Sequence, residues 1–262
     1  MRGPYENRVA VITGGTSGIG KAASRELVRK GTKVVLAGRN IERGDSAVRT
    51  ITDAGGEAIF VKTDVSRETE VRLLFEQALT TFGRLDYLFN NAGIEGVLGP
   101  ITECPEKVCD DVLSINTKGV ILCIKHAIPE MLKNGGGAIV NTASFVGTTV
   151  PFPDGVVYGA SKAAVLSITT SVALGFAEYG IRVYTVCPWM TDTPMANRLA
   201  GNQPDVKADL AKLNPSGRFV KPEEIADVVL AMFENSSRFI SGEVVLVDSG
   251  GQTQKIHMPH AI

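Results

Sequence analysis

Short apolar segments alternate with longer helical segments along the whole chain of 262 residues, and this alternation restricts the possible folds more than any other feature. The apolar segments are rich in valine and isoleucine, as strands buried on both faces are. They comprise residues 8–13, 33–37, 57–62, 85–90, 137–142, 181–186 and 243–247. Helical patterns fit residues 19–30, 41–54, 67–82, 102–133 with a break near Asn116, 156–178 and 222–234. We therefore predict one α/β domain over residues 1–262, with a doubly wound, seven-stranded, mainly parallel sheet covered by helices on both faces.

One long segment, residues 188–221, departs from this rhythm. Segments of that length inside compact domains usually act as lids or binding loops. We expect it to close over a substrate.

The composition argues against several classes of protein. With 44% hydrophobic residues and a formal charge of -1, the chain has no strongly basic character to favour nucleic acid or a membrane surface. No apolar run approaches the roughly 20 residues of a membrane span, and the N-terminus lacks an apolar signal segment. Four scattered cysteines are typical of reduced thiols, so we expect a cytoplasmic protein. We expect no metal site, because His257 and His260 have no cysteines near them in the sequence.

A glycine-rich loop follows the first strand and opens the first helix, in the sequence Thr13-Gly-Gly-Thr-Ser-Gly-Ile-Gly20. Glycines at positions 14, 18 and 20 allow a tight turn, close approach of a phosphate and close packing of helix on strand. The helix N-terminus then presents free N–H groups to the pyrophosphate. The alternative is a plain turn, but the strand–loop–helix context favours a Rossmann-type dinucleotide site.

The end of the second strand indicates which dinucleotide binds. An Asp or Glu usually contacts the ribose of NAD at this point, about 20 residues after the glycines. This chain has Ala37-Gly-Arg-Asn40 there, without a carboxylate. Arg39 can pair with a 2′-phosphate, so we predict that NADP(H) is favoured over NAD(H). Alternatively, Arg39 stacks on adenine or points into solvent.

Tyr158 and Lys162 are four residues apart in a predicted helix, so they share a helix face. A free tyrosine has a pKa of about 10, and a nearby ammonium lowers it. The pair therefore predicts an acid–base group that works near neutral pH. The alternative is an ordinary solvated helix face.

Taken together, these motifs resemble those of the short-chain dehydrogenase/reductase family, in its ordinary single-domain branch. The resemblance extends over essentially the whole chain. It is carried by the glycine loop, Asn90-Asn-Ala-Gly93, Ser144, Tyr158 with Lys162, Pro188, Ser241-Gly242 and Val247-Asp248. It implies an NAD(P)(H)-dependent oxidoreductase that interconverts a ketone or aldehyde with a secondary alcohol.

The resemblance also implies roles for individual residues. Tyr158 is expected to be the general acid in reduction and the base in oxidation, with Ser144 on the substrate oxygen. Lys162 is expected to hold the nicotinamide ribose and lower the tyrosine pKa, and Asn116 to bend its helix and hold a water. The implied cofactor site comprises Gly14, Thr16, Ser17, Gly18, Ile19, Gly20, Arg39, Asn40, Asp64, Val65, Asn91, Ala92, Gly93, Tyr158, Lys162, Pro188, Thr191 and Thr193.

Three of these residues have structural alternatives. Asn116 fits an interhelical cap, Ser144 an ordinary hydroxyl at a strand end, and Asp64 the cap of a helix that begins near Ser66. Polar residues at the ends of elements are commonly caps. The joint arrangement favours the site, because cofactor sites in such sheets lie beyond the carboxyl ends of the strands.

The chain departs from the family pattern at two positions. Ser144 precedes Tyr158 by 14 residues, where the family usually has 13, and a loop bulge can absorb the extra residue. Trp189 follows Pro188 where the family commonly has glycine. The indole can wall a substrate pocket or pack beneath the lid.

The sequence predicts a hydrophobic carbonyl substrate. The substrate-binding residues we expect are Ser144, Phe145, Phe152, Trp189 and Met190, although the apolar ones also fit an ordinary core. The alternatives are a 3-oxoacyl-thioester reductase of the same family and a non-catalytic NADP-binding regulatory protein. The resemblance further implies a homotetramer, or a homodimer, for which the apolar stretch 166–176 suits an interface.

Overall fold

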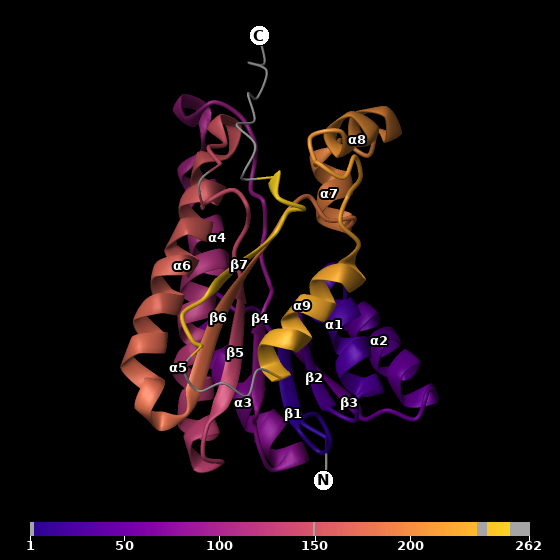
Figure 1. Ribbon diagram of the computed structural model, residues 1–262, viewed down its shortest axis with the longest axis vertical. Coiled ribbons are helices and arrows are strands. Elements are labelled where there is room, and N and C mark those ends of the chain that lie inside the picture. The colour runs from indigo at the N-terminus through magenta and orange to yellow at the C-terminus, as the bar shows by residue number, and fades with distance from the viewer. Residues whose placement is uncertain (1–2, 149, 235–239, 252–262) are drawn as a thin grey trace.

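Seven parallel strands form one sheet in the order β3-β2-β1-β4-β5-β6-β7 in a computed structural model of the chain (Figure 1). The structure describes residues 3–148, 150–234 and 240–251, so His257 and His260 lie outside the described residues. The strands are β1 (Val9–Thr13), β2 (Lys33–Gly38), β3 (Ala58–Lys62), β4 (Tyr87–Asn90), β5 (Gly137–Thr142), β6 (Ile181–Pro188) and β7 (Val244–Val247). The predicted α/β fold is confirmed, and every described strand pairing is parallel.

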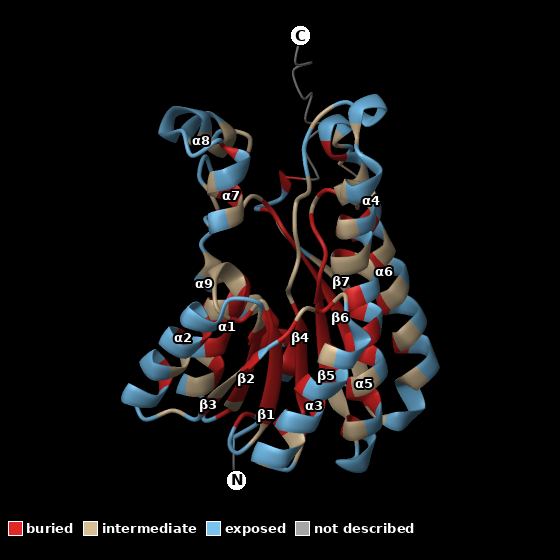
Figure 2. Cartoon of the chain, turned by 180° about the vertical axis from the view of Figure 1, so that it is seen from behind, coloured by how far each residue is buried: buried red, intermediate tan, exposed pale blue. Residues whose placement is uncertain are grey.

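Side chains that alternate along each strand build a core on both faces of the sheet. Val9 and Val11 of β1 join the cluster beneath α3 (Glu68–Phe82), α5 (Gly119–Lys133) and α6 (Val156–Phe176). Ala10 and Ile12 join the cluster beneath α1 (Gly18–Arg29), α2 (Ile41–Asp53) and α9 (Pro222–Glu234). Figure 2 shows the buried strands between these two layers of helices. Both faces are covered, which is why the strands read as continuous apolar runs.

The order of the strands reverses between β1 and β4, which pair with each other although β2 and β3 lie between them in the sequence. Open α/β sheets bind ligands beyond the carboxyl ends of the strands at such a switch point. The glycine loop after β1 and the Asn90-Asn-Ala-Gly93 segment at the end of β4 both lie there.

The single helix predicted over residues 102–133 is divided in the structure. A 3-10 turn (Ile101–Glu103) precedes α4 (Glu106–Leu113), and a π-helical turn (Ser114–Lys118) leads into α5. The helix begins after Pro105 because proline lacks an N–H and disfavours helical backbone in the residue before it. The expected break falls at the π-helical turn, which contains Asn116.

The predicted lid, residues 188–221, contains two short helices, α7 (Pro194–Leu199) and α8 (Pro204–Ala211). Each begins with a proline at its first turn, a position where the missing N–H has no intrahelical partner to lose. The side chain of Thr193 caps α7 by accepting a hydrogen bond from Ala196 N at 3.3 Å.

Helix α6 is long and apolar, and with its flanking turns, residues 153–179, it meets the length and hydropathy of a membrane span. One face of α6 lies against the sheet, where Val165, Thr169 and Ala173 are buried. The opposite face carries Leu174, which is 84% exposed. The apolar composition therefore serves packing on one side and leaves an unpartnered surface on the other.

Candidate active site

The glycine loop forms a cradle at the N-terminus of α1. Gly14 and Gly18 have φ angles of 65° and 48°, which favour glycine. A Cβ on Gly20 would lie 2.4 Å from the carbonyl oxygen of Gly14, so only glycine fits without a backbone shift. The side chain of Ser17, the N-cap residue, makes no capping hydrogen bond. The first-turn N–H groups of α1 therefore face a site that suits a phosphate, and the Ser17 hydroxyl is not used in capping the helix.

Hydrogen bonds join this loop to the segment after β4. Thr13 Oγ1 accepts from the N–H groups of Asn91 and Ala92, each at 3.0 Å. The Asn91 amide in turn donates to the carbonyl oxygens of Thr13 and Gly14 at 3.2 and 3.4 Å. The two loops of the switch point thus form one unit.

The lid also reaches the glycine loop. A Cβ on Gly18 would lie 3.0 Å from Cγ2 of Thr193, and Thr191 Oγ1 donates to the carbonyl oxygen of Trp189 at 2.8 Å. A Cβ on Gly38 would lie 3.5 Å from Thr16 Oγ1, so the loop also borders the end of β2. Thr193, from the predicted cofactor site, is therefore a neighbour of the glycine loop.

At the end of β2, Arg39 is exposed and Asn40 caps α2, accepting from Arg43 N at 2.7 Å. The Asp64 carboxylate accepts from Ser66 N and Oγ at 3.0 and 2.7 Å, which is the turn-forming alternative for this residue. Burial alone would raise the pKa of Asp64, but the Ser66 hydrogen bonds and the Arg39 charge lower it. Arg39 and Asp64 therefore lie within electrostatic reach of each other. Val65 is buried beneath Gly119.

Lys162 is only 4% exposed, and its Nζ lies over the ring of Tyr158, 5.7 Å from the centroid. The ammonium donates to the carbonyl oxygen of Thr142 at 2.9 Å. Burial of the charge lowers the pKa of Lys162 to about 8. The lysine can therefore hold or lose its proton near neutral pH.

Burial raises the pKa of Tyr158 to about 12, opposed by a hydrogen bond with Ser144 and reinforced by the negative charge of Glu95. Lys162 was expected to lower the pKa of Tyr158, whereas in the structure this pKa is raised. The physical reason is desolvation of the phenolate. Lys162, whose pKa is about 8, has already lost its charge at the pH where Tyr158 titrates, and its Nζ is hydrogen-bonded to Thr142. In this state Tyr158 is a protonated hydrogen-bond donor.

Asn116 is fully buried and bonds to the backbone of Ile94 in both directions. Its Oδ1 accepts from Ile94 N and its Nδ2 donates to Ile94 O, each at 2.9 Å. Nδ2 also donates to Ser161 Oγ at 3.0 Å, and Ser161 Oγ donates to the Tyr158 carbonyl at 2.7 Å. The chain Asn116–Ser161–Tyr158 positions the first turn of α6. No role was predicted for Ser161, although a serine hydroxyl in a helix commonly bonds back to the backbone three or four residues earlier.

Gly93 lies beside both Asn116 and Lys162. A Cβ there would approach Asn116 Oδ1 to 3.2 Å and Lys162 Nζ to 3.4 Å. Ser144 is 5% exposed, and its Oγ accepts from Val146 N at 3.2 Å. The segment between Ser144 and Tyr158, one residue longer than in the family pattern, folds back onto α6. A Cβ on Gly147 would lie only 2.8 Å from Ala163 N of that helix.

Of the apolar residues expected to bind substrate, only Trp189 is buried, and Phe145, Phe152 and Met190 are partly exposed. Phe145 and Trp189 stack with centroids 4.2 Å apart, and Met190 packs against the same cluster beneath α9. Trp189 is 3% exposed, and its Nε1 has no hydrogen-bond partner among the described residues. Phe152 lies against Gly155. Of the two alternatives for Trp189, the structure thus has the packed one.

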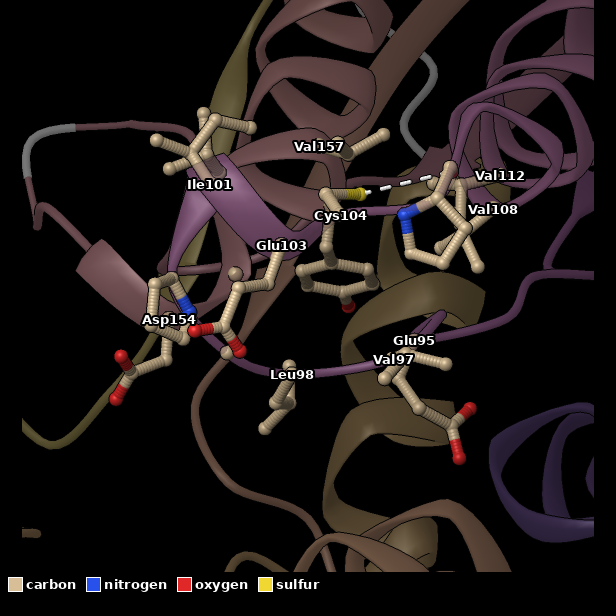
Figure 3. A pocket seen from close by; sticks show the side chains of 16 residues that line it. Glu95, Val97, Leu98, Ile101, Glu103, Cys104, Val108, Val112, Asp154 and Val157 are labelled. Carbon is tan, nitrogen blue, oxygen red and sulfur yellow. Dashed lines mark hydrogen bonds between the residues drawn. The ribbon is translucent and has the colours of Figure 1, made fainter.

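A cavity of about 100 Å³ lies beside Tyr158 (Figure 3). It is lined by the loop after β4, by α4 and by the start of α6, so the expected residues Phe145, Phe152, Trp189 and Met190 are not part of its wall. Cys104, Val108 and Val112 were missed from the sequence, although Val108 and Val112 share a helix face. The wall is mainly apolar, with Glu95, Glu103 and Asp154 at its edges.

The residues present fit a nicotinamide dinucleotide. The glycine cradle, the uncommitted Ser17 hydroxyl and the exposed Arg39 suit its phosphates, and Lys162 lies one helical turn from Tyr158 for the ribose end. When bound, the nicotinamide supplies or accepts a hydride. Within the described residues, no group of three His, Cys, Asp or Glu side chains lies close enough to hold a metal ion.

Comparisons with known proteins agree with this geometry. Residues 14–252 match the family model described as enoyl-(acyl carrier protein) reductase. The chain is 40% identical over 246 residues to cis-4-hydroxycyclohexanecarboxylate dehydrogenase of Sinomonas cyclohexanicum, covering 94% of this chain and 97% of the relative.

Two crystal structures are also similar. Levodione reductase superposes with a TM-score of 0.91 at 31% identity, covering 95% of this chain and 98% of that one. NAD+-bound xylitol dehydrogenase superposes with a TM-score of 0.89 at 30% identity, covering 94% and 99%. These relatives match the chain over nearly their whole length, and the chain has both the glycine cradle and the Tyr158–Lys162 pair. The chain therefore belongs to the short-chain dehydrogenase/reductase family and is an NAD(P)-dependent oxidoreductase.

Proposed function

We propose that the protein reversibly reduces a ketone to a secondary alcohol, with Tyr158 as the general acid and base. The observation that carries the proposal is the position of Tyr158. It lines the apolar cavity, contacts Ser144 and has Lys162 Nζ over its ring, next to the loops of the switch point.

In reduction, Tyr158 donates its proton to the carbonyl oxygen while Ser144 donates a hydrogen bond to the same oxygen. A pKa near 12 keeps the phenol protonated at neutral pH, which suits this direction. Lys162, with a pKa near 8, can return a proton to the phenolate. In oxidation Tyr158 must accept the proton instead, so alcohol oxidation is favoured by higher pH.

We propose NADP(H) as the favoured cofactor, held at its 2′-phosphate by Arg39. The exposed guanidinium follows β2, and no carboxylate stands between Ala37 and Asn40 to repel a phosphate. The Arg39 charge lowers the pKa of the Asp64 carboxylate, so the two side chains lie at the same end of the site. NAD(H), the cofactor named for the xylitol dehydrogenase structure, is the alternative outcome of the test.

We propose an alicyclic ketone and its alcohol as the substrate pair. The apolar wall formed by Val97, Leu98, Val108, Val112 and Val157 suits a hydrocarbon ring. The relative from Sinomonas carries a hydroxycyclohexane in its name. A 3-oxoacyl thioester, which is larger and more polar, is the competing substrate.

We also propose that the single domain assembles into a homotetramer, or a homodimer, through α6. Leu174 is 84% exposed on that helix, and only 28% of the apolar window within residues 153–179 is buried. A contiguous exposed apolar surface of this kind marks an interaction site. Light scattering of the purified protein checks this; a monomer at micromolar concentration contradicts it.

The experiment for the function is a substrate panel followed by nicotinamide absorbance, in both directions and with both cofactors. The panel holds cyclohexanone with its 4-carboxylate derivative, a linear ketone and a 3-oxoacyl thioester. We expect the highest kcat/KM with a ring ketone and NADPH. No turnover of any ketone, with cofactor binding intact, would instead support the regulatory alternative.

A further inference from the structure

Two cysteines face each other at the start of α4. The Sγ atoms of Cys104 and Cys109 lie 3.6 Å apart. Cys104 ends the 3-10 turn, Pro105 is the N-cap of α4, and Cys109 lies in the first turn and a half of the helix. These are the two positions whose side chains meet at helix starts as a hydrophobic staple. Here the staple consists of two thiols.

The two thiols are accessible, unlike the other cysteines. Cys104 and Cys109 are partly exposed, whereas Cys123 and Cys187 are buried. A sulfur–sulfur hydrogen bond with Cys109 raises the pKa of Cys104, so Cys104 suits the role of the second thiol, which resolves the sulfenic acid. Cys104 also lines the cavity beside Tyr158, and Figure 3 shows its side chain among the lining residues.

We propose that Cys104 and Cys109 form a reversible intramolecular disulfide in response to hydroperoxides, and that this bond alters the wall of the cavity. One thiol is oxidised by hydrogen peroxide to a sulfenic acid, with release of one water. The second thiol attacks that sulfur, the S–S bond forms, and a second water leaves. Two thiols lose two protons and two electrons, and one peroxide becomes two waters.

The local structure permits this closure. The sulfur atoms must approach from 3.6 Å to a bond length of about 2.05 Å. Cys104 can supply the movement, because it lies outside the helix with extended backbone angles, φ -70° and ψ 117°. Cys109 is fixed by its helix. Closure therefore draws the Cys104 sulfur toward α4.

The first test measures the bond itself and does not depend on activity. The reduced protein is treated with hydrogen peroxide, and its intact mass is expected to fall by about 2 Da. Trypsin cleaves after Lys107, between the two cysteines, so the oxidised protein should yield the peptides that contain Cys104 and Cys109 as one linked species. Dithiothreitol should separate them.

Matched variants assign the bond. Cys104→Ser and Cys109→Ser should each abolish the loss of 2 Da, while Cys123→Ala should retain it. Thermal unfolding checks that all three variants fold. Mass gains of about 16 or 32 Da without linked peptides, or a disulfide between two chains, would overturn the proposal.

The second test measures the effect on the cavity and rests on the proposed function. We expect the fully oxidised protein to show at least a threefold change in KM for the ketone, with the dissociation constant of NADPH changed less than twofold. Cys109→Ser, at a position that does not line the cavity, should show the same KM before and after treatment with peroxide. An unchanged KM in protein that carries the disulfide by mass would refute the effect on the cavity, whereas absence of turnover before oxidation would refute the proposed function instead.

Discussion

Arg198 of α7 donates two hydrogen bonds to the carboxylate of Glu95, which lies 103 residues earlier in the sequence. Arg198 Nε lies 2.6 Å from Glu95 Oε1, and the second guanidinium nitrogen lies 3.0 Å from Oε2. Glu95 lines the cavity beside Tyr158, and its charge raises the pKa of that residue. The bidentate pair therefore ties the lid to the loop that borders the proposed acid–base group.

Replacing Arg198 by alanine should release the lid and raise KM for the ketone. Partly exposed ion pairs contribute about 0.2 to 1 kcal/mol, which corresponds to a KM increase of up to roughly fivefold. Steady-state kinetics measures this change. Arg218→Ala is the matched control, because Arg218 makes a similar bidentate pair with Glu224 that does not reach the cavity. Equal effects of the two variants would mean that the Glu95 pair has no special role.

Replacing Lys162 by methionine should change the free energy of unfolding in a pH-dependent way. The variant should gain more stability over wild type at pH 7 than at pH 10. The pKa of Lys162 falls from 10.5 in the unfolded chain to about 8 in the fold. Below pH 8 both states carry the proton, so the full cost of burying the charge is present. Between pH 8 and 10 the folded state alone loses the proton, and wild type becomes more stable as the pH rises.

Urea unfolding at the two pH values measures this difference. We expect the advantage of Lys162→Met to shrink by about 2 to 3 kcal/mol from pH 7 to pH 10. The variant also loses the hydrogen bond to Thr142, which costs about 1 kcal/mol of stability at either pH. This loss drops out when the results at pH 7 and pH 10 are subtracted. Lys118→Met, at an exposed position, is the control. A difference that does not change with pH would show that Lys162 is not desolvated in the fold.

Arg39→Ala should weaken binding of NADPH and leave binding of NADH nearly unchanged. A charge-assisted hydrogen bond to a phosphate contributes about 1.5 to 3 kcal/mol, or a ten- to hundredfold change in Kd. Nicotinamide fluorescence titration measures both cofactors. Arg49→Ala removes an exposed arginine from the same region, in α2, and should change neither. An equal loss for NADH and NADPH would contradict a 2′-phosphate contact.

Gly20→Ala should lower both stability and cofactor affinity. The new Cβ would lie 2.4 Å from Gly14 O and 2.7 Å from Asn91 Nδ2, so the cradle must shift. Overpacking of this kind costs about 1 to 3 kcal/mol, and we expect Tm to fall by about 3 to 10 °C.

Gly175→Ala is the contrasting variant, because a Cβ in that part of α6 meets nothing within 4 Å. It should raise stability by about 0.5 to 1 kcal/mol through helix propensity. Calorimetry measures both variants. If Gly20→Ala unfolds at the wild-type temperature and binds NADPH normally, the tight cradle is not required.

The elements that could be predicted from the sequence depend on local patterns. Continuous Val and Ile runs identified the strands, and the glycine loop located the switch point. Pro105 could have corrected the start of α4, and Pro194 and Pro204 could have revealed the helices of the lid, since proline favours the first helical turn.

The features that the sequence did not yield depend on distant parts of the chain. The pKa of Tyr158 rises because burial desolvates the phenolate, and burial is a property of the assembled fold. The pairing of Glu95 with Arg198 joins segments far apart in the sequence. Phe145 and Trp189 were ambiguous between core and pocket, and only their stacking within the core distinguishes the two.

Tyr158→Phe is the decisive variant for proton transfer by Tyr158. The variant removes only the hydroxyl, and general acid–base catalysis is typically worth 10² to 10⁴-fold. The measurement is kcat for the best ketone of the panel, together with the Kd of NADPH. We expect kcat to fall by at least about 100-fold while Kd changes less than about twofold. Turnover within a few fold of wild type would contradict it.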